Sequence, residues 1–202
     1  GNPPYVETKH YKAASPIMHE YLTNKYVTFE GKADLSVLFI ERCLSLLARN
    51  GKFGLIVQRR WFKTNYGRMA RHMITHGHYL SKLIDFKATD IFPGRITYVS
   101  IMVLEKGGNP HLQYYYMPEA ADTIRTKFEN ADESGHFTGC QFQNIDYDDD
   151  DAPWTFESFA IQSLKKRLQE EWGTLGQYPQ LQVKDGIQAV SYTHLTLPTI
   201  RL

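Results

Sequence analysis

The 202-residue sequence has few cysteines, no long apolar run and no Gly-x-Gly turn. Its two cysteines, Cys43 and Cys140, lie far apart and match no metal-ligand spacing, which argues against a disulfide framework. No uninterrupted apolar stretch approaches the ~20 residues of a membrane helix, and the chain does not open with a basic segment followed by an apolar one. We therefore expect a soluble protein without a membrane partner.

Two groups of side chains could suggest a bound cation, but neither has the companions that a metal site needs. His72, His76 and His78 lie close in sequence without carboxylate or cysteine companions. Asp148 to Asp151 form an acidic run that no glycine-punctuated ligand pattern follows. We predict no metal in this segment.

Charge is divided unevenly along the chain, although the net charge is only +1. Up to Lys106 there are 16 Lys and Arg against 8 Asp and Glu, and from Gly107 onward there are 7 against 14. A basic half concentrates an anionic partner, whereas an acidic half repels it. With 42% hydrophobic residues, the chain is large enough for one globular domain and an attached piece.

Apolar periodicity predicts an alternation of helices and strands between residues 34 and 117. Asp34 is placed to cap the first helix, and Asn50-Gly51 to end it. The run KFGLIV, residues 52–57, suits a strand buried on both faces. The expected helices cover residues 34–50 and 65–77, and the expected strands cover residues 52–57, 79–86, 97–105 and 111–117. Such an alternation predicts an α/β fold with a mostly parallel sheet covered by helices.

The remainder of the chain contributes less to the expected core. Residues 118–130 read as a surface helix with Pro118 in its first turn. Residues 131–151 are too polar and acidic to supply much core, so they are interpreted as a linker. Residues 156–172 have the spacing of an amphipathic helix.

The first residues, Asn2, Pro3, Pro4 and Tyr5, form the sequence Asn-Pro-Pro-Tyr. Proline fixes its own φ, removes a backbone donor and pushes the preceding residue toward extended geometry. A stiff, non-helical segment with outward-facing carbonyls is therefore expected. Its plainest interpretation is a turn.

Followed by the α/β alternation, Asn-Pro-Pro-Tyr resembles the catalytic motif of the amino-methylating DNA methyltransferases, in particular the gamma-class adenine-N6 enzymes. The similarity continues in the family's order through residues 33–57 (ADLSVLFIERCLSLLARNGKFGLIV), 58–77 and 83–106. This ordered match is far more specific than the tetrapeptide alone.

The resemblance implies that residues 1–117 are the C-terminal half of a Rossmann-like methyltransferase domain that uses S-adenosyl-L-methionine. Residues 118–177 would be a helical and acidic linker, and 178–190 the start of a truncated target-recognition domain. Residues 191–202 continue none of these patterns and are expected to be a non-native tail. The missing Gly-x-Gly turn implies that most of the cofactor site lies upstream, so the fragment alone is expected to be inactive. The whole enzyme would methylate double-stranded DNA in the prokaryotic cytoplasm, in restriction-modification or phage defence.

The resemblance also assigns site residues. In the family, the Asn side-chain oxygen and the first Pro carbonyl accept the two amino hydrogens of an extruded adenine, and Asn2 and Pro3 match them. Tyr5 and Phe92 match the rings on the two faces of that base. The expected cofactor contacts are Asn2, Pro4 and Phe39, where Phe39 matches a residue near the adenine of S-adenosyl-L-methionine and is equally well explained by core packing.

Basic residues on loops beside the expected site could contact DNA phosphates. They are Arg59, Arg60, Lys87 and Arg95. Arg59 and Arg60 depart from the Pro-containing loop of the family, and a solvated surface explains them equally well. Two other functions stay open: methylation of an RNA guanine or a protein glutamine, and nucleic-acid binding by a remnant without catalysis.

Overall fold

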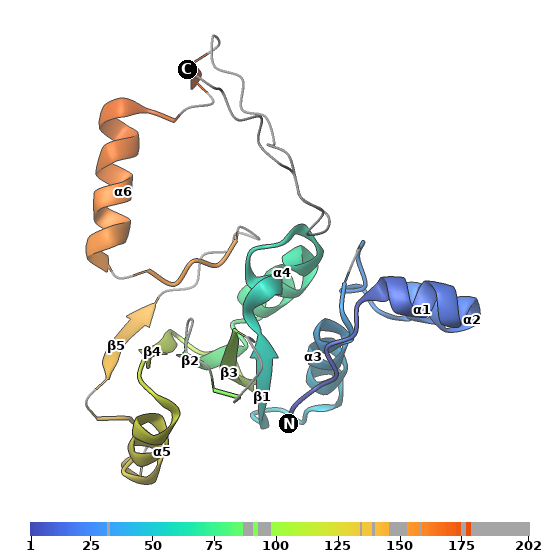
Figure 1. Ribbon diagram of the computed structural model, residues 1–202, viewed down its shortest axis with the longest axis horizontal. Coiled ribbons are helices and arrows are strands. Elements are labelled where there is room, and N and C mark those ends of the chain that lie inside the picture. Colours follow the sequence, from blue (N-terminus) through green and yellow to red (C-terminus); the bar gives the residue numbers. More distant parts are fainter. Residues whose placement is uncertain are drawn as a thin grey trace, which may run out of the picture. The chain divides into compact units, whose positions relative to one another are not determined.

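The computed structural model describes residues 1–31, 33–86, 91–92, 98–133, 135–138, 140–145, 153–157, 159–174 and 177–178 (Figure 1). The chain divides into two compact units, residues 1–156 and 157–202. The first unit therefore extends past the boundary predicted at residue 117. The described part of the second unit contains helix α6 (Phe159–Trp172), where an amphipathic helix is predicted. The segments expected at 178–190 and 191–202 lie, apart from Tyr178, outside the described residues.

The first unit is built on a five-stranded sheet with the order β1-β3-β2-β4-β5. The strands are β1 (Lys52–Gln58), β2 (Leu80–Asp85), β3 (Val99–Glu105), β4 (Leu112–Tyr116) and β5 (Gln141–Ile145). The first four lie where strands are predicted. However, β3 runs antiparallel to both β1 and β2, β5 runs antiparallel to β4, and only β2 and β4 pair in parallel. The prediction of a mostly parallel sheet is wrong, because two-sided burial produces the same apolar runs in either strand direction.

Helix α3 (Leu35–Leu46) begins as predicted, because the Asp34 side chain accepts a hydrogen bond from Ser36 N at 2.8 Å. It ends at Leu46 rather than at Asn50. There the Lys106 ammonium donates to the carbonyls of Leu44 and Leu47, at 3.2 and 3.1 Å. A cation on these otherwise unpaired carbonyls stabilises the helix end.

The region of the second predicted helix has three pieces. Two 3₁₀ turns, η1 (Arg59–Phe62) and η2 (Asn65–Gly67), lead from β1 into helix α4 (Arg68–His76). Before the sheet, residues to which no element is assigned from sequence form helices α1 (Thr8–Ala14) and α2 (Pro16–Lys25). Within the described ranges, no helix combines the length and apolarity needed to cross a bilayer.

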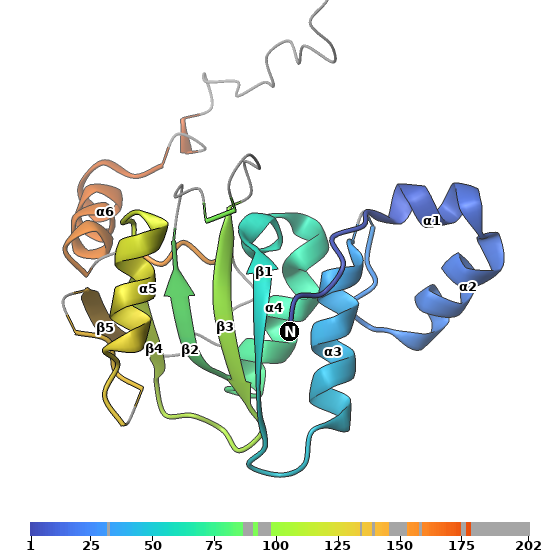
Figure 2. The same ribbon diagram turned by 60° about the horizontal axis from the view of Figure 1, so that its bottom comes forward.

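Side chains alternate between the two faces of the sheet, and each face buries its own cluster. On β2, Leu83 joins the core that α3 and α4 cover, whereas Ile84 joins the core on the side of α5 (Ala121–Glu129). On β4, Tyr114 and Tyr115 divide in the same way. Figure 2 shows α4 behind the strands and α5 in front of them. The observed fold is therefore a three-layer α/β arrangement.

The segment interpreted as a linker belongs to this fold. Helix α5 begins after Ala120, so Pro118 precedes the helix instead of lying in its first turn. Phe137 is buried in the α5-side core, and residues 141–145 pair with β4 as its antiparallel neighbour. The interpretation of 131–151 as a segment with little core is wrong for this part. Side-chain contacts of Phe137, His136 and Phe142 with Tyr115, together with backbone pairing, attach it, and average polarity does not reveal them.

Phe137→Ala tests this attachment. Removing a buried phenylalanine leaves a cavity, so the free energy of unfolding is expected to fall by about 3–5 kcal/mol in urea titration. Gln141→Ala, an exposed position on β5, should change it by less than about 0.5 kcal/mol. Equal, small effects of both changes would contradict the described packing.

Candidate active site

Backbone hydrogen bonds hold the Asn-Pro-Pro-Tyr segment between β1 and the start of α3. Gly1 N donates to Gly54 O at 2.6 Å, and Ile56 N donates to Gly1 O at 2.9 Å. Farther along, Leu35 N donates to Val6 O at 3.1 Å. In both ribbon views the start of the chain lies between β1 and α3 (Figures 1 and 2).

Within this segment, the side chains differ in exposure. Asn2 and Pro4 are exposed, Pro3 is buried, and Tyr5 is half-buried. The Tyr5 hydroxyl lies 2.7 Å from Ile56 O and 2.8 Å from Asn2 Oδ1. Burial, and secondarily the Asp34 carboxylate, raise the pKa of Tyr5 to about 12. The hydroxyl is therefore protonated at neutral pH and is available as a donor.

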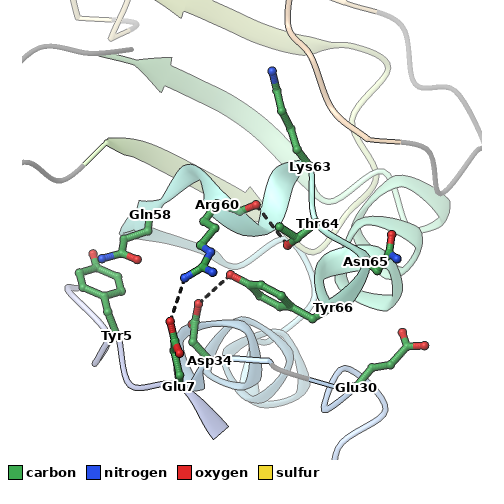
Figure 3. A pocket seen from close by; sticks show the side chains of 11 residues that line it. Tyr5, Glu7, Glu30, Asp34, Gln58, Arg60, Lys63, Thr64, Asn65 and Tyr66 are labelled. Carbon is green, nitrogen blue, oxygen red and sulfur yellow. Dashed lines mark hydrogen bonds and ion pairs between the residues drawn. The ribbon is translucent and has the colours of Figure 1, made fainter. Parts of the chain in front are cut away.

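A cavity of about 820 Å³ adjoins Tyr5 (Figure 3). Its described walls carry both signs of charge and two aromatic rings. They include Tyr5, Glu7, Glu30, Asp34, Arg60, Lys63 and Tyr66.

Two contacts across this cavity join η2 to the N-cap of α3 and η1 to Glu7, which follows the motif. The Tyr66 hydroxyl donates to Asp34 Oδ2 at 3.2 Å, and burial followed by the Asp34 charge raises the pKa of Tyr66. Arg60 Nη1 lies 2.8 Å from Glu7 Oε1, in an exposed ion pair (Figure 3). The cavity is therefore bounded by side chains that already contact one another.

Hydrogen bonds from a buried arginine hold the loop that carries Arg60 and Lys63. Arg71 is only 2% exposed and donates from Nη1 to Trp61 O at 2.7 Å and to Thr64 O at 2.8 Å. Gly67 comes so close to this loop that a Cβ there would lie 1.9 Å from Trp61 O. Gly67 and Arg71 together therefore fix the backbone of the loop from which these side chains extend.

The surroundings of Arg59 differ from both interpretations made from the sequence, a DNA phosphate contact and a solvated surface position. Its side chain is 17% exposed, and Nη2 lies 3.1 Å from Oδ2 of the fully buried Asp85. The Tyr114 hydroxyl donates to the same oxygen at 2.9 Å. The solvated-surface interpretation is therefore wrong for Arg59, which ties the carboxyl end of β1 to that of β2. Arg60, in contrast, is exposed.

The other predicted site residues differ in their exposure and in whether the structure describes them. Phe39 on α3 is 44% exposed, so the core-packing interpretation of this ring is wrong. Phe92 is half-buried and packs against the α5-side core, and it is not among the described residues that line the cavity beside Tyr5. Lys87 and Arg95 lie outside the described residues. The structure thus brings Asn2 and Tyr5 together, while a pairing of Tyr5 with Phe92 stays a prediction.

Sequence reasoning missed four residues that shape the site. Glu7 and Tyr66 line the cavity, Lys63 stands on its rim loop, and Arg71 holds that loop. Glu7 follows the motif closely in sequence, but the other three are revealed only by contacts across the fold. In the described part of the chain, no group of three or more His, Cys, Asp or Glu residues is arranged to hold a metal ion.

Comparison with known proteins shows what this chain is similar to. Residues 1–92 match the Eco57I restriction-modification methylase family. The Type II restriction enzyme and methyltransferase RM.Eco57I of Escherichia coli is 32% identical over 115 residues, which are 57% of this chain and 12% of that protein. The Type II methyltransferase M.XhoI of Xanthomonas vasicola is 36% identical over 107 residues, 52% of this chain and 19% of that protein.

Solved structures of restriction-modification proteins share the fold of this chain. A DrdV–DNA complex is similar with a TM-score of 0.54 and 13% identity, over 73% of this chain and 17% of that chain. A nuclease-deletion mutant of the Type ISP enzyme LlaGI is similar with a TM-score of 0.53 and 16% identity, over 81% and 18%. The matched part of this chain therefore spans less than a fifth of the length of the relatives and structures named here.

The two arginines after β1 should differ sharply in their contribution to stability. Arg59→Ala leaves the buried Asp85 carboxylate without its guanidinium, which is expected to cost about 3 kcal/mol, since Tyr114 still donates to it. Arg60→Ala removes an exposed ion pair and should cost less than about 1 kcal/mol. Urea unfolding of both variants measures the difference, and similar costs would contradict the buried pairing of Arg59.

Proposed function

We propose that this chain is the catalytic-motif segment of a DNA methyltransferase that transfers the methyl group of S-adenosyl-L-methionine to N6 of an extruded adenine in double-stranded DNA. The observation that carries the proposal is the exposed Asn2 amide, which lies against the Tyr5 hydroxyl. Tyr5 lines a cavity, and both residues lie in the segment that matches the Eco57I restriction-modification methylase family.

The single hydroxyl hydrogen of Tyr5 supports a role for Asn2 as an acceptor for the amino group of adenine. A phenol has one hydrogen, so the Tyr5 hydroxyl can donate to Ile56 O or to Asn2 Oδ1, but not fully to both. If Ile56 O takes this hydrogen, a half-turn of the Asn2 amide makes Nδ2 the donor to the Tyr5 oxygen. Oδ1 then faces outward as a free acceptor for an amino hydrogen.

Adenine N6 needs such acceptors because its lone pair is delocalised into the ring. In the proposed reaction, Asn2 Oδ1 and the Pro3 carbonyl each accept one amino hydrogen. Two fixed acceptors favour a tetrahedral nitrogen whose lone pair is directed at the methyl donor. The nitrogen loses its proton as the bond to methyl forms, so no strong general base is required.

The base must first leave the duplex, which costs a few kcal/mol of unstacking. Stacking on an aromatic ring offsets about 1–3 kcal/mol of that cost. The half-buried Tyr5 ring is assigned to one face of the adenine and Phe92 to the other. The mixed lining of the cavity beside Tyr5 offers donors and acceptors to the polar edges of a base.

Features of the chain fit S-adenosyl-L-methionine, whose sulfonium-bound methyl group is the electrophile when the cofactor is present. Phe39 exposes a large aromatic ring on α3, although Leu38 and Ile40 on either side of it are buried. An exposed ring of this kind suits a stacked adenine. Asn2 and Pro4 are exposed in the segment that joins β1 to the start of the same helix through backbone hydrogen bonds of Gly1 and Val6, and both are assigned to the cofactor with Phe39.

Asn2→Ala in the full-length protein that carries this segment tests the proposal. Loss of one fixed acceptor should lower kcat for adenine methylation by at least about 100-fold. Asn24→Ala, on the exposed surface of α2, is the matched control. Labelled methyl transfer onto DNA, RNA and protein is measured together. Undiminished transfer by Asn2→Ala, or transfer by the unaltered protein onto RNA or protein alone, would reject the assignment.

Tyr5→Phe separates the ring from the hydroxyl. The variant keeps the stacking surface but loses the group that orients Asn2, so kcat should fall about 10-fold while the Kd for DNA stays the same. Tyr5→Ala should weaken DNA binding as well. If Tyr5→Phe and Tyr5→Ala behave alike in both measurements, the hydroxyl has no separate role.

A further inference from the structure

A second cavity, of about 520 Å³, lies at the carboxyl end of β1. It shares Gln58, Arg60, Lys63 and Thr64 with the cavity beside Tyr5. Its other described walls include Arg59 and Tyr98. The shared residues form a ridge between the two cavities.

The two cavities differ in charge. Among the described residues that line the second cavity, three are cationic and none is acidic. The first cavity has three carboxylates, Glu7, Glu30 and Asp34, against two cations. Because a surface of one sign concentrates ions of the opposite sign, a polyanion is attracted to the second cavity rather than to the first.

Of the three cations in the second cavity, Lys63 has its charge uncompensated. Arg59 is paired with Asp85, and Arg60 is paired with Glu7. Lys63 has no carboxylate partner among the residues that the structure describes. Figure 3 shows its side chain extending away from the Glu7–Arg60 pair.

Hydrogen bonds also fix the backbone around Lys63, and the exposed aromatic ring of Tyr98 lines the same cavity. Lys63 N donates to Arg60 O at 3.3 Å, and the next carbonyl, Thr64 O, is held by the buried Arg71. Tyr98 is 53% exposed, and its backbone carbonyl accepts from Arg59 N at 3.0 Å, which ties it to the same end of β1. A cation and an aromatic ring in one groove are the two elements that bind nucleic-acid strands without reading sequence.

We infer that the second cavity binds the phosphodiester backbone of a DNA strand, with Lys63 contacting a phosphate and Tyr98 stacking on a neighbouring base. The inference rests on the proposed function, in which DNA is the substrate. It moves the phosphate contact of this loop from Arg59 and Arg60, whose charges are paired, to Lys63.

The test is a salt titration of DNA affinity. A fluorescein-labelled DNA duplex is titrated with the full-length protein at several salt concentrations, and log K is plotted against log salt. Each phosphate contact contributes about 0.9 to the slope for duplex DNA. Lys63→Gln should therefore flatten the slope by about 0.9, and Lys63→Arg should restore it. Lys12→Gln, at an exposed lysine on α1, is the matched control and should keep the original slope.

Tyr98→Ala tests the second element of the groove. Loss of a stacked base should weaken binding by about 5- to 150-fold at every salt concentration without changing the slope. An unchanged slope for Lys63→Gln, or an equal change for Lys12→Gln, would overturn the phosphate contact, and unchanged affinity for Tyr98→Ala would overturn the stacking. Failure of the unaltered protein to bind DNA even at low salt would instead contradict the proposed function.

Discussion

The backbone hydrogen bonds that tie residues 1–8 to β1 and to the start of α3 are the constraint on which the candidate site depends. Asn2 and Pro4 are exposed and only Pro3 between them is buried, so packing alone does little to define the direction of this segment. Ile56 N to Gly1 O on one side and Leu35 N to Val6 O on the other supply that direction. Asp34 strengthens the second attachment, since one carboxylate caps α3, accepts from Tyr66 and raises the pKa of Tyr5. The same local geometry therefore holds the segment that carries Asn2 and half-buries the Tyr5 hydroxyl that lies against its amide.

Ion pairs at the carboxyl ends of the strands divide the cations near the site into structural and available ones. Arg59 is half of a buried pair, and a buried pair contributes mainly by avoiding the cost of a lone buried charge. Arg60 is half of an exposed pair, which contributes little to stability and can exchange partners. Lys63 is the cation that the described carboxylates leave uncompensated. A count of positive residues along the sequence does not distinguish these three cations, whereas their burial and their ion pairs do.

Much of the fold is predictable from the sequence because it depends on local pattern. The strands at 52–57 and 79–86 and the Asp34 cap follow from apolar runs and capping chemistry, both of which act over a few residues. Strand direction does not follow, because β3 has the same apolar composition as its neighbours and yet runs opposite to them. Phe137 and β5 do not follow either, since a few side-chain contacts with Tyr115 and backbone pairing attach a polar segment to the sheet. At the site, the motif predicts Asn2 and Tyr5, but the Arg59–Asp85 and Arg71–Trp61 contacts join residues on different elements.

The arrangement of these contacts gives a physical reason for placing the chemistry and the DNA contact side by side. Ligands of open α/β sheets bind outside the carboxyl ends of parallel-running strands, where loops diverge. Here Gln58 ends β1 and Arg59 follows it, and Asp85 ends β2, which runs in the same direction as β1 because both strands are antiparallel to β3. One cavity at this end is bordered by the motif and has excess negative charge, which suits the donor groups of a base. The neighbouring cavity has only positive charge among its described lining residues, which suits the phosphates that connect that base to its strand. A nucleotide carries both kinds of group a few ångströms apart, so two adjacent cavities of opposite character match a single extruded nucleotide better than either cavity does alone.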